Sequence, residues 1–261
     1  MSAPLVLEQV ELHARGRALL DGVSLRIEPG QFVVLVGPNG AGKTSILRVA
    51  LGLLRPTRGA VRLGDSSIFD LSPRARAAAL AWLPQQPVRD EPLTALETVA
   101  IARYRFGEAN AASLVAARSA LERAGAVAFA ERRVTELSGG ERQRVALAGL
   151  LAQEAPLLLV DEPANHLDPA QQIEAYELLG RCFEAGLGVL CVTHDVNLLV
   201  HTGAADRIRV VGLGLGRIRF ELPFGAPELP RELGALFGLE LRALELDGRR
   251  LILPERAAGS R

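Results

Sequence analysis

Several features that other protein classes depend on are scarce in this sequence. Only two of its 261 residues are cysteines, Cys182 and Cys191, and both lie in apolar segments. Buried free thiols in a reducing compartment are therefore expected rather than a disulfide framework. No apolar run approaches the ~18 residues that a bilayer-spanning helix needs. The first residues carry Glu8 and Glu11 and no basic cluster, so we expect no secretory signal.

An excess of charge of one sign is also absent. The sequence has 30 Lys and Arg residues and 30 Asp and Glu residues, which gives a formal net charge of zero. Because broad binding to nucleic acid needs a positive surface, we expect no nucleic-acid partner. The hydrophobic content of 49% indicates a globular chain. A neutral protein has little repulsion between copies, which is compatible with an obligate protein partner.

The strongest motif that is present is GPNGAGKTS, residues 37–45. It stands between an apolar, strand-like run at 31–36 and a helical pattern from 46, and it matches the phosphate-loop spacing G-x-x-x-x-G-K-[ST]. Glycines allow backbone N–H groups to surround a triphosphate, and the lysine and threonine would serve the terminal phosphates and Mg²⁺. The predicted nucleotide-binding residues are Gly37, Pro38, Asn39, Gly40, Ala41, Gly42, Lys43, Thr44 and Ser45.

A second motif, LLLVDEP at residues 157–163, places two carboxylates at the end of a buried strand. Neighbouring residues of a strand point to opposite sides, so Asp161 and Glu162 must have different roles. Asp161 suits the Mg²⁺ shell and Glu162 suits polarising the attacking water. The alternative is an acid pair that caps a following helix, which the phosphate loop in the same chain disfavours.

A third motif, ELSGGERQRVALAGLLAQ at residues 136–153, predicts a helix capped by Ser138. Gly139 and Gly140 in its first turn cost about 1 kcal/mol each against alanine. Such a cost is expected where a ligand must approach the backbone, and a helix N-terminus suits a phosphate. A second phosphate site suggests two halves that meet over one nucleotide.

The remaining pattern alternates apolar strands with helices, which predicts an α/β fold with a mainly parallel central sheet. The tail predicts a helix and then a hairpin that turns at Asp247-Gly248. We interpret GLGLGR, residues 212–217, as a turn between two strands rather than a dinucleotide loop. No metal-ligand spacing joins His13, His166 or His201 to the cysteines, so we expect no zinc site. Six arginines are expected to lie on solvated faces, and some of them to contact a membrane partner: Arg74, Arg76, Arg103, Arg105, Arg132 and Arg133.

The ordered set GPNGAGKT, LPQ, LSGGE, LLLVDEP, NHLD and VTHD resembles the ATP-binding subunits of ABC transporters over about residues 5–220. The context of these motifs and the tail is most similar to the importer subfamily for siderophores, haem and vitamin B12. The resemblance implies a P-loop NTPase (RecA-like) core, an antiparallel β subdomain and an inserted helical subdomain. It divides one ABC ATPase domain, 1–261, into a core (about 1–86 and 154–221), a helical subdomain (about 87–153) and a tail (about 222–261).

The resemblance also implies roles for single residues. Gln85 would sense Mg²⁺ and water and link to the membrane partner, with Gln86 as the other register. Ser138, Gly139, Gly140 and Glu141 would form the signature that contacts ATP of a second subunit. Asp168 would signal across the dimer, and His194 would contact the γ-phosphate and hold Glu162. The implied catalytic residues are Glu162, His194 and Gln85, and the implied Mg²⁺ residues are Thr44, Gln85 and Asp161.

The segment before the second strand departs from the family pattern. Many members stack an aromatic residue on adenine there, whereas this sequence has Ala14 at the matching position. Stacking is left to His13 or Arg15, or the base is held loosely, so selectivity for ATP over GTP is open. Glu141 stands where glutamine is commoner.

The expected function is ATP hydrolysis with Mg²⁺ by a homodimer on the cytoplasmic face of the cell membrane. The expected partners are integral membrane permease subunits and, indirectly, a substrate-binding protein, for import of a metal chelate. A cytosolic non-transport ABC ATPase and an ABC exporter subunit are the alternatives. Chromosome-class ABC ATPases are disfavoured because no sustained heptad run occurs, and translation-type factors because only one motif set is present.

Overall fold

The computed structural model describes residues 3–14, 16–85, 92–165 and 167–255. A six-stranded sheet in the order β10-β9-β3-β8-β7-β6 forms the centre of the molecule. Its strands are β3 (Phe32–Val36), β6 (Leu80–Leu83), β7 (Leu157–Asp161), β8 (Gly188–Val192), β9 (Ile208–Gly214) and β10 (Arg217–Pro223). All neighbouring pairs run parallel except β9 with β10, so the expectation of a mainly parallel sheet is confirmed.

Both faces of this sheet are buried, and β3 shows why. All five of its residues are buried, and they alternate between two apolar clusters. Phe32, Val34 and Val36 face one cluster, whereas Val33 and Leu35 face the other. Because side chains alternate along a strand, an unbroken apolar run supplies both faces of a covered parallel sheet.

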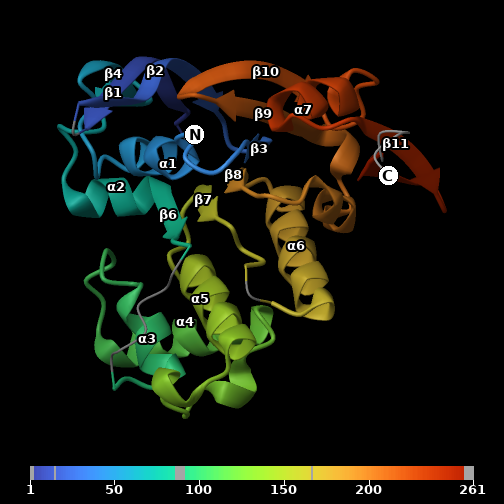
Figure 1. The fold of residues 1–261 in the computed structure, drawn as a ribbon. Coiled ribbons are helices and arrows are strands. Elements are labelled where there is room, and N and C mark those ends of the chain that lie inside the picture. The colour runs from blue at the N-terminus through green and yellow to red at the C-terminus, as the bar shows by residue number, and fades with distance from the viewer. Residues whose placement is uncertain (1–2, 15, 86–91, 166, 256–261) are drawn as a thin grey trace.

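An antiparallel sheet with the order β2-β1-β4-β5 covers one side of the core. Its strands are β1 (Leu5–Ala14), β2 (Arg17–Ile27), β4 (Arg58–Leu63) and β5 (Ser66–Ser67). Figure 1 shows β1, β2 and β4 at one end of the molecule, next to α1 (Lys43–Ala50). The short helix α2 (Pro73–Ala79) is capped by Ser72, which accepts a hydrogen bond from the Ala75 N–H, and it has proline in its first turn.

Helices gather at the opposite end of Figure 1 from the antiparallel sheet. They are α3 (Ala95–Ile101), α4 (Asn110–Arg123) and α5 (Gly139–Ala152), with 3₁₀ turns at Val127–Phe129 and Val134–Glu136. Across the described residues, no helix is both long enough and apolar enough to cross a membrane.

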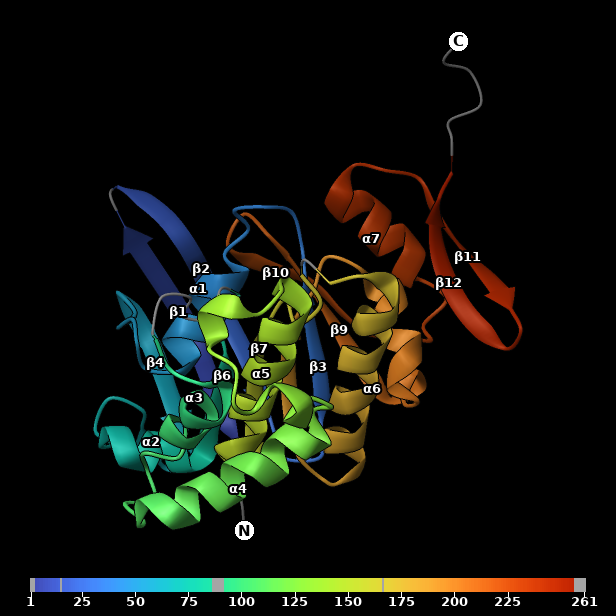
Figure 2. The same ribbon diagram turned by 90° about the horizontal axis from the view of Figure 1, so that it is seen from below.

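The chain then forms α6 (Pro169–Glu184), the 3₁₀ turns Val196–Thr202 and Ala205–Arg207, and the C-terminal elements. These are α7 (Leu229–Phe237) and the hairpin of β11 (Leu241–Leu246) and β12 (Arg249–Pro254), which project from one end of the sheet in Figures 1 and 2. The predicted Asp247-Gly248 turn is confirmed, because both residues have positive φ, 50° and 71°. The turn in 212–217 is confirmed too, since it joins β9 to β10.

One expectation about the surface is wrong. Arg103 was expected on a solvated face, but its side chain is only 6% exposed. It pairs with Glu108 and Glu154 and donates to the Ala152 carbonyl, 3.0 Å away. These acceptors come from two segments, around residue 108 and residues 152–154, and compensate the guanidinium for lost water; no local sequence pattern reveals them.

Candidate functional site

The carboxyl ends of three neighbouring strands bring the predicted site residues together. The phosphate loop follows β3, the two carboxylates end β7, and His194 follows β8. A cavity of about 290 Å³ lies at this edge. It is lined by loop residues 39–45 and by Leu19, Gln85, Glu162 and His194. Open parallel sheets bind ligands at this edge of the sheet.

The phosphate loop has a backbone that only glycine permits at two positions. A Cβ on Gly37 would lie 2.1 Å from the Leu213 carbonyl oxygen. Gly42 has a φ of 105°, and a Cβ there would lie 2.6 Å from the Leu19 carbonyl oxygen. Both glycines are needed for the loop to pass so close to β9 and β2.

Lys43 is folded over the loop that precedes it. Its Nζ donates hydrogen bonds to the carbonyl oxygens of Gly37 and Pro38, at 2.7 and 3.1 Å. Burial lowers the pKa of the Lys43 amine, and the nearby carboxylates of Glu162 and Asp161 act in the opposite direction. The side chain thus supplies a cation at the floor of the cavity.

The surroundings of Asp161 fit a divalent cation. The residue is 1% exposed, and its buried Oδ1 has no hydrogen-bond partner among the described residues. Burial raises the pKa of this carboxyl, while hydrogen bonding with Thr44 and the charge of Lys43 lower it. A buried carboxylate oxygen beside a threonine hydroxyl is the hard donor set that Mg²⁺ prefers.

Glu162 is held by two side chains from distant segments, Gln85 and His194, and by Asn165 of its own turn. Gln85 Nε2 donates to its Oε2 at 2.7 Å, and Asn165 Nδ2 donates to the same oxygen at 3.2 Å. His194 Nε2 contacts its other oxygen, Oε1. The backbone of Glu162 has a positive φ of 53°, and its N–H donates to the Val192 carbonyl. Such strain persists where surrounding contacts fix a functional side chain.

Asn165 contacts Glu162, and the sequence alone indicates no role for this residue. It closes the turn that starts at Glu162, its N–H donating to the Glu162 carbonyl at 3.1 Å, and asparagine is common in turns. Only the folded loop shows its amide reaching back to the carboxylate.

The signature residues lie outside this cavity. Ser138 caps α5 as predicted, and it forms a capping box in which the Glu141 carboxylate accepts the Ser138 N–H at 2.7 Å. Glu141 also pairs with Arg132. A Cβ on Gly140 would lie 1.9 Å from Oε1 of Gln171 in α6, so the Gln171 side chain packs directly over this glycine. Of the four signature residues, none is among the residues that line the 290 Å³ cavity.

Asp168 also lies outside the cavity. It caps α6, and its Oδ1 accepts the Gln171 N–H at 2.9 Å. The neighbouring His166, and Gln86 with the segment that follows it, fall outside the described residues.

Comparison with known proteins decides the family. The family model described as ABC transporter matches residues 20–165. The chain belongs to the ABC transporter family. The hemin import ATP-binding protein HmuV of Rhodopseudomonas palustris (strain HaA2) is 36% identical to it, over 98% of this chain and 98% of that protein. The protein of the same name from Bordetella pertussis is 38% identical over 92% and 95% of the two chains.

A solved structure of the same fold supports this. The cassette matches the dimeric, post-hydrolysis structure of the ATP-binding cassette MJ0796 bound to ADP and Pi, with a TM-score of 0.77 and 29% identity. The match covers 85% of this chain and 99% of that one. The cassette is therefore an ATP-binding ATPase with a P-loop NTPase core, an antiparallel β sheet and a helical region.

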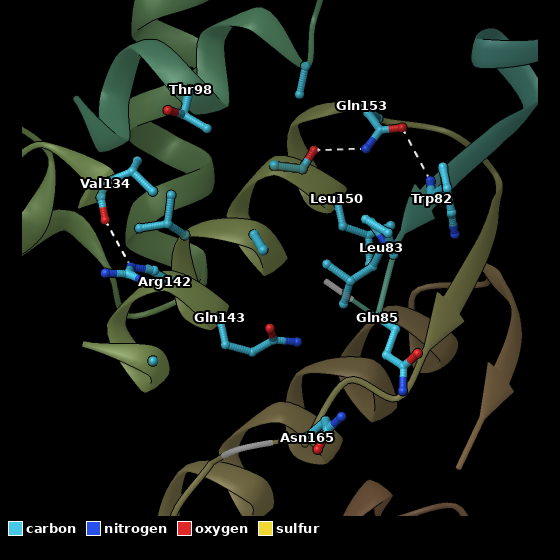
Figure 3. Close-up of a pocket in the computed structure, with 16 residues that line it drawn as sticks. Trp82, Leu83, Gln85, Thr98, Val134, Arg142, Gln143, Leu150, Gln153 and Asn165 are labelled. Atoms are coloured by element: carbon cyan, nitrogen blue, oxygen red, sulfur yellow. Dashed lines mark hydrogen bonds between the residues drawn. The ribbon is translucent and has the colours of Figure 1, made fainter. Parts of the chain in front are cut away.

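A second, larger cavity of about 540 Å³ opens between the core of the cassette and its helices. Figure 3 shows Thr98 and Val134 on one side of it and Gln85 and Asn165 on the other. The amide of Gln153 bridges its wall, accepting from the Trp82 N–H at 3.3 Å and donating to the Gly149 carbonyl at 3.1 Å. Gln85 lines this cavity and the 290 Å³ cavity alike, so one side chain lies between them.

Proposed function

We propose that this chain is the ATP-binding and ATP-hydrolysing subunit of an ABC importer for a metal chelate of the siderophore, haem or cobalamin class. The observation that carries the proposal is the alignment to hemin import ATP-binding proteins over nearly the whole of both chains, tail included. The transporter's channel is formed by separate permease subunits, and the cassette works at the cytoplasmic face of the membrane.

Within the subunit, the P-loop residues 37–45 bind the phosphates of ATP. Bound Mg²⁺ supplies positive charge to the phosphates, and Thr44, Asp161 and Gln85 are its proposed ligands. Glu162 orients and polarises the attacking water, and His194 and Gln85 fix its carboxylate through the contacts described above.

Two copies complete the site. The related ATP-binding cassette is dimeric in its solved structure. Because Ser138, Gly139, Gly140 and Glu141 stand away from the chain's own nucleotide cavity, we assign them to the ATP bound by the second copy. Asp168, at the start of α6, is the proposed contact that signals between the copies.

The 540 Å³ cavity is the proposed contact of the permease. Its lining combines apolar side chains of α5 with Gln85, which also touches Glu162. A permease segment seated there would therefore contact a residue that holds the catalytic carboxylate.

The proposed subdomain limits are unchanged from those expected, with the core at about 1–86 and 154–221, the helical subdomain at about 87–153 and the tail at about 222–261.

Purification of tagged protein from detergent-solubilised membranes of its source cell, followed by identification of partners, tests this proposal. A polytopic membrane protein recovered in matching amounts supports it, and uptake assays of the pair with haem, a ferric siderophore and cobalamin identify the cargo or reveal export. Ala146→Arg in the cavity should abolish recovery of the permease, whereas Ala112→Arg on the exposed face of α4 should not. Recovery of soluble partners alone would favour a non-transport ABC ATPase instead.

A further inference from the structure

A buried tyrosine hydroxyl lies behind the His194 turn. Tyr176 of α6 is 0% exposed, and its hydroxyl donates a 2.7 Å hydrogen bond to Thr193 Oγ1. Burial raises the pKa of this phenol well above its ordinary value, so the hydroxyl stays protonated and a donor. Burying a hydroxyl group costs free energy unless the group is hydrogen-bonded, so a buried tyrosine hydroxyl at this place needs an explanation.

Thr193 is the residue just before His194, and its hydroxyl is fully used. Thr193 Oγ1 accepts from Tyr176 and from the Asp195 N–H at 3.2 Å, and it donates to the Asp195 carbonyl at 3.2 Å. The Thr193 N–H donates to the Leu35 carbonyl of β3. The hydroxyl therefore links the turn to α6 and to the backbone of Asp195, while the Thr193 N–H links it to β3 of the central sheet.

His194 depends on that turn for its direction. Its side chain is 45% exposed and contacts Glu162, and no other hydrogen bond of its ring is found among the described residues. The place that each rotamer of a half-exposed imidazole reaches depends on the backbone that carries it. The fixing comes from the residues on each side, 193 and 195.

We propose that Tyr176 is a positioning residue for His194, acting through Thr193 to hold the turn in which the imidazole meets the Glu162 carboxylate. It rests on the proposed role of Glu162 and His194 in hydrolysis. Asp168 caps α6, and Gln171 in the first turn of this helix packs over Gly140 of α5, so Tyr176 also ties the His194 turn to the helix that carries the proposed dimer contacts.

Tyr176→Phe tests this by removing one oxygen atom. We expect kcat for ATP to fall about three- to tenfold, the loss associated with one neutral hydrogen bond, with KM unchanged. Tyr104→Phe is the matched control, because Tyr104 is the other tyrosine of the chain and is 55% exposed, and within the described residues it donates only to the Pro73 carbonyl. It should leave both constants as they are.

Thr193 supplies an independent pair of variants. Thr193→Val should lower kcat and Thr193→Ser should restore it, and Tyr176→Phe combined with Thr193→Val should be no slower than the slower single variant. The His194 imidazole resonances, assigned with a His194→Gln variant, should shift or broaden in Tyr176→Phe, which lost packing alone would not cause.

The outcomes separate this inference from the proposed function. Wild-type kcat and unchanged His194 resonances in both Tyr176→Phe and Thr193→Val would overturn the positioning role, while an inactive His194→Gln would leave the function standing. Wild-type turnover in His194→Gln would refute the role of His194 itself.

Discussion

The side-chain amide of Gln85 lies 2.7 Å from the carboxylate of Glu162, although the two residues are 77 positions apart. Gln85 was expected to serve Mg²⁺, and here it is also a donor to the proposed catalytic carboxylate. Because Gln85 lines the larger cavity as well, a partner bound there would reach the hydrolytic site through one hydrogen bond.

Glu162→Gln should nearly abolish turnover while ATP binding is preserved. The amide keeps the size of the side chain but loses the charge that polarises water, a contribution of about 10²- to 10⁴-fold in rate. Single-turnover hydrolysis and calorimetric ATP binding measure the two effects separately. Normal hydrolysis by this variant would show that the base is another residue.

Asn165→Ala should lower kcat by less, about three- to tenfold, because it removes one of several hydrogen bonds to Glu162. Asn197→Ala, whose side chain bonds instead to the backbone of Ile252 in β12, is the control for loss of an asparagine outside the site. Equal effects of the two variants on kcat would argue against a role for Asn165.

Lys43 is the only lysine in the sequence, so an amine-selective reagent reports on the phosphate loop. Since burial lowers the pKa of its amine, the neutral, reactive form should appear at a lower pH than for an exposed lysine. We expect ATP to protect Lys43 from labelling, as read by peptide mass spectrometry. Lys43→Ala should weaken ATP binding about 10- to 100-fold through the loss of charge-assisted bonds. Labelling that is insensitive to ATP, together with unchanged ATP affinity of Lys43→Ala, would contradict the phosphate-loop assignment.

Asp161→Asn should stabilise the metal-free protein and abolish its stabilisation by Mg²⁺ with ATP. The carboxylate is buried with an unpaired oxygen, so neutralising it should raise the free energy of unfolding by about 1 kcal/mol in EDTA. Thermal unfolding of both proteins, with EDTA and with Mg-ATP, provides the comparison. A variant that is less stable in EDTA would mean that Asp161 is a structural acceptor instead.

Both thiols should be inert in the native protein. Cys182 and Cys191 are buried, and burial raises the pKa of each, so little reactive thiolate forms near pH 8. A thiol-reactive dye should count no rapidly reacting group before unfolding and two after it. A fast-reacting native thiol would contradict the packing of β8 or α6.

The sequence was informative where function depends on local backbone. The glycines of residues 37–42, the Ser138 cap and the Asp247-Gly248 turn are determined by neighbouring residues, and the fold class follows from apolar periodicity. The sequence was less informative about contacts that depend on the folded structure. Arg103 resembled a surface arginine because its acceptors lie up to 51 residues away, and the Tyr176 contact depends on how α6 packs. The Asn165 contact is local, but it depends on the conformation of the turn after Glu162. The proposed roles of Ser138 and Asp168 came from resemblance, since the structure of one chain does not display a site that two copies are proposed to share.

The most direct measurement is the molar mass of Glu162→Gln in solution by light scattering, with and without Mg-ATP, together with the ATP bound per chain. We expect a monomer without nucleotide, and with Mg-ATP a particle of twice the chain mass that retains two ATP molecules. Ser138→Arg in the same background should bind ATP but stay monomeric. A Glu162→Gln protein that remains monomeric with ATP bound would contradict the shared, two-copy site.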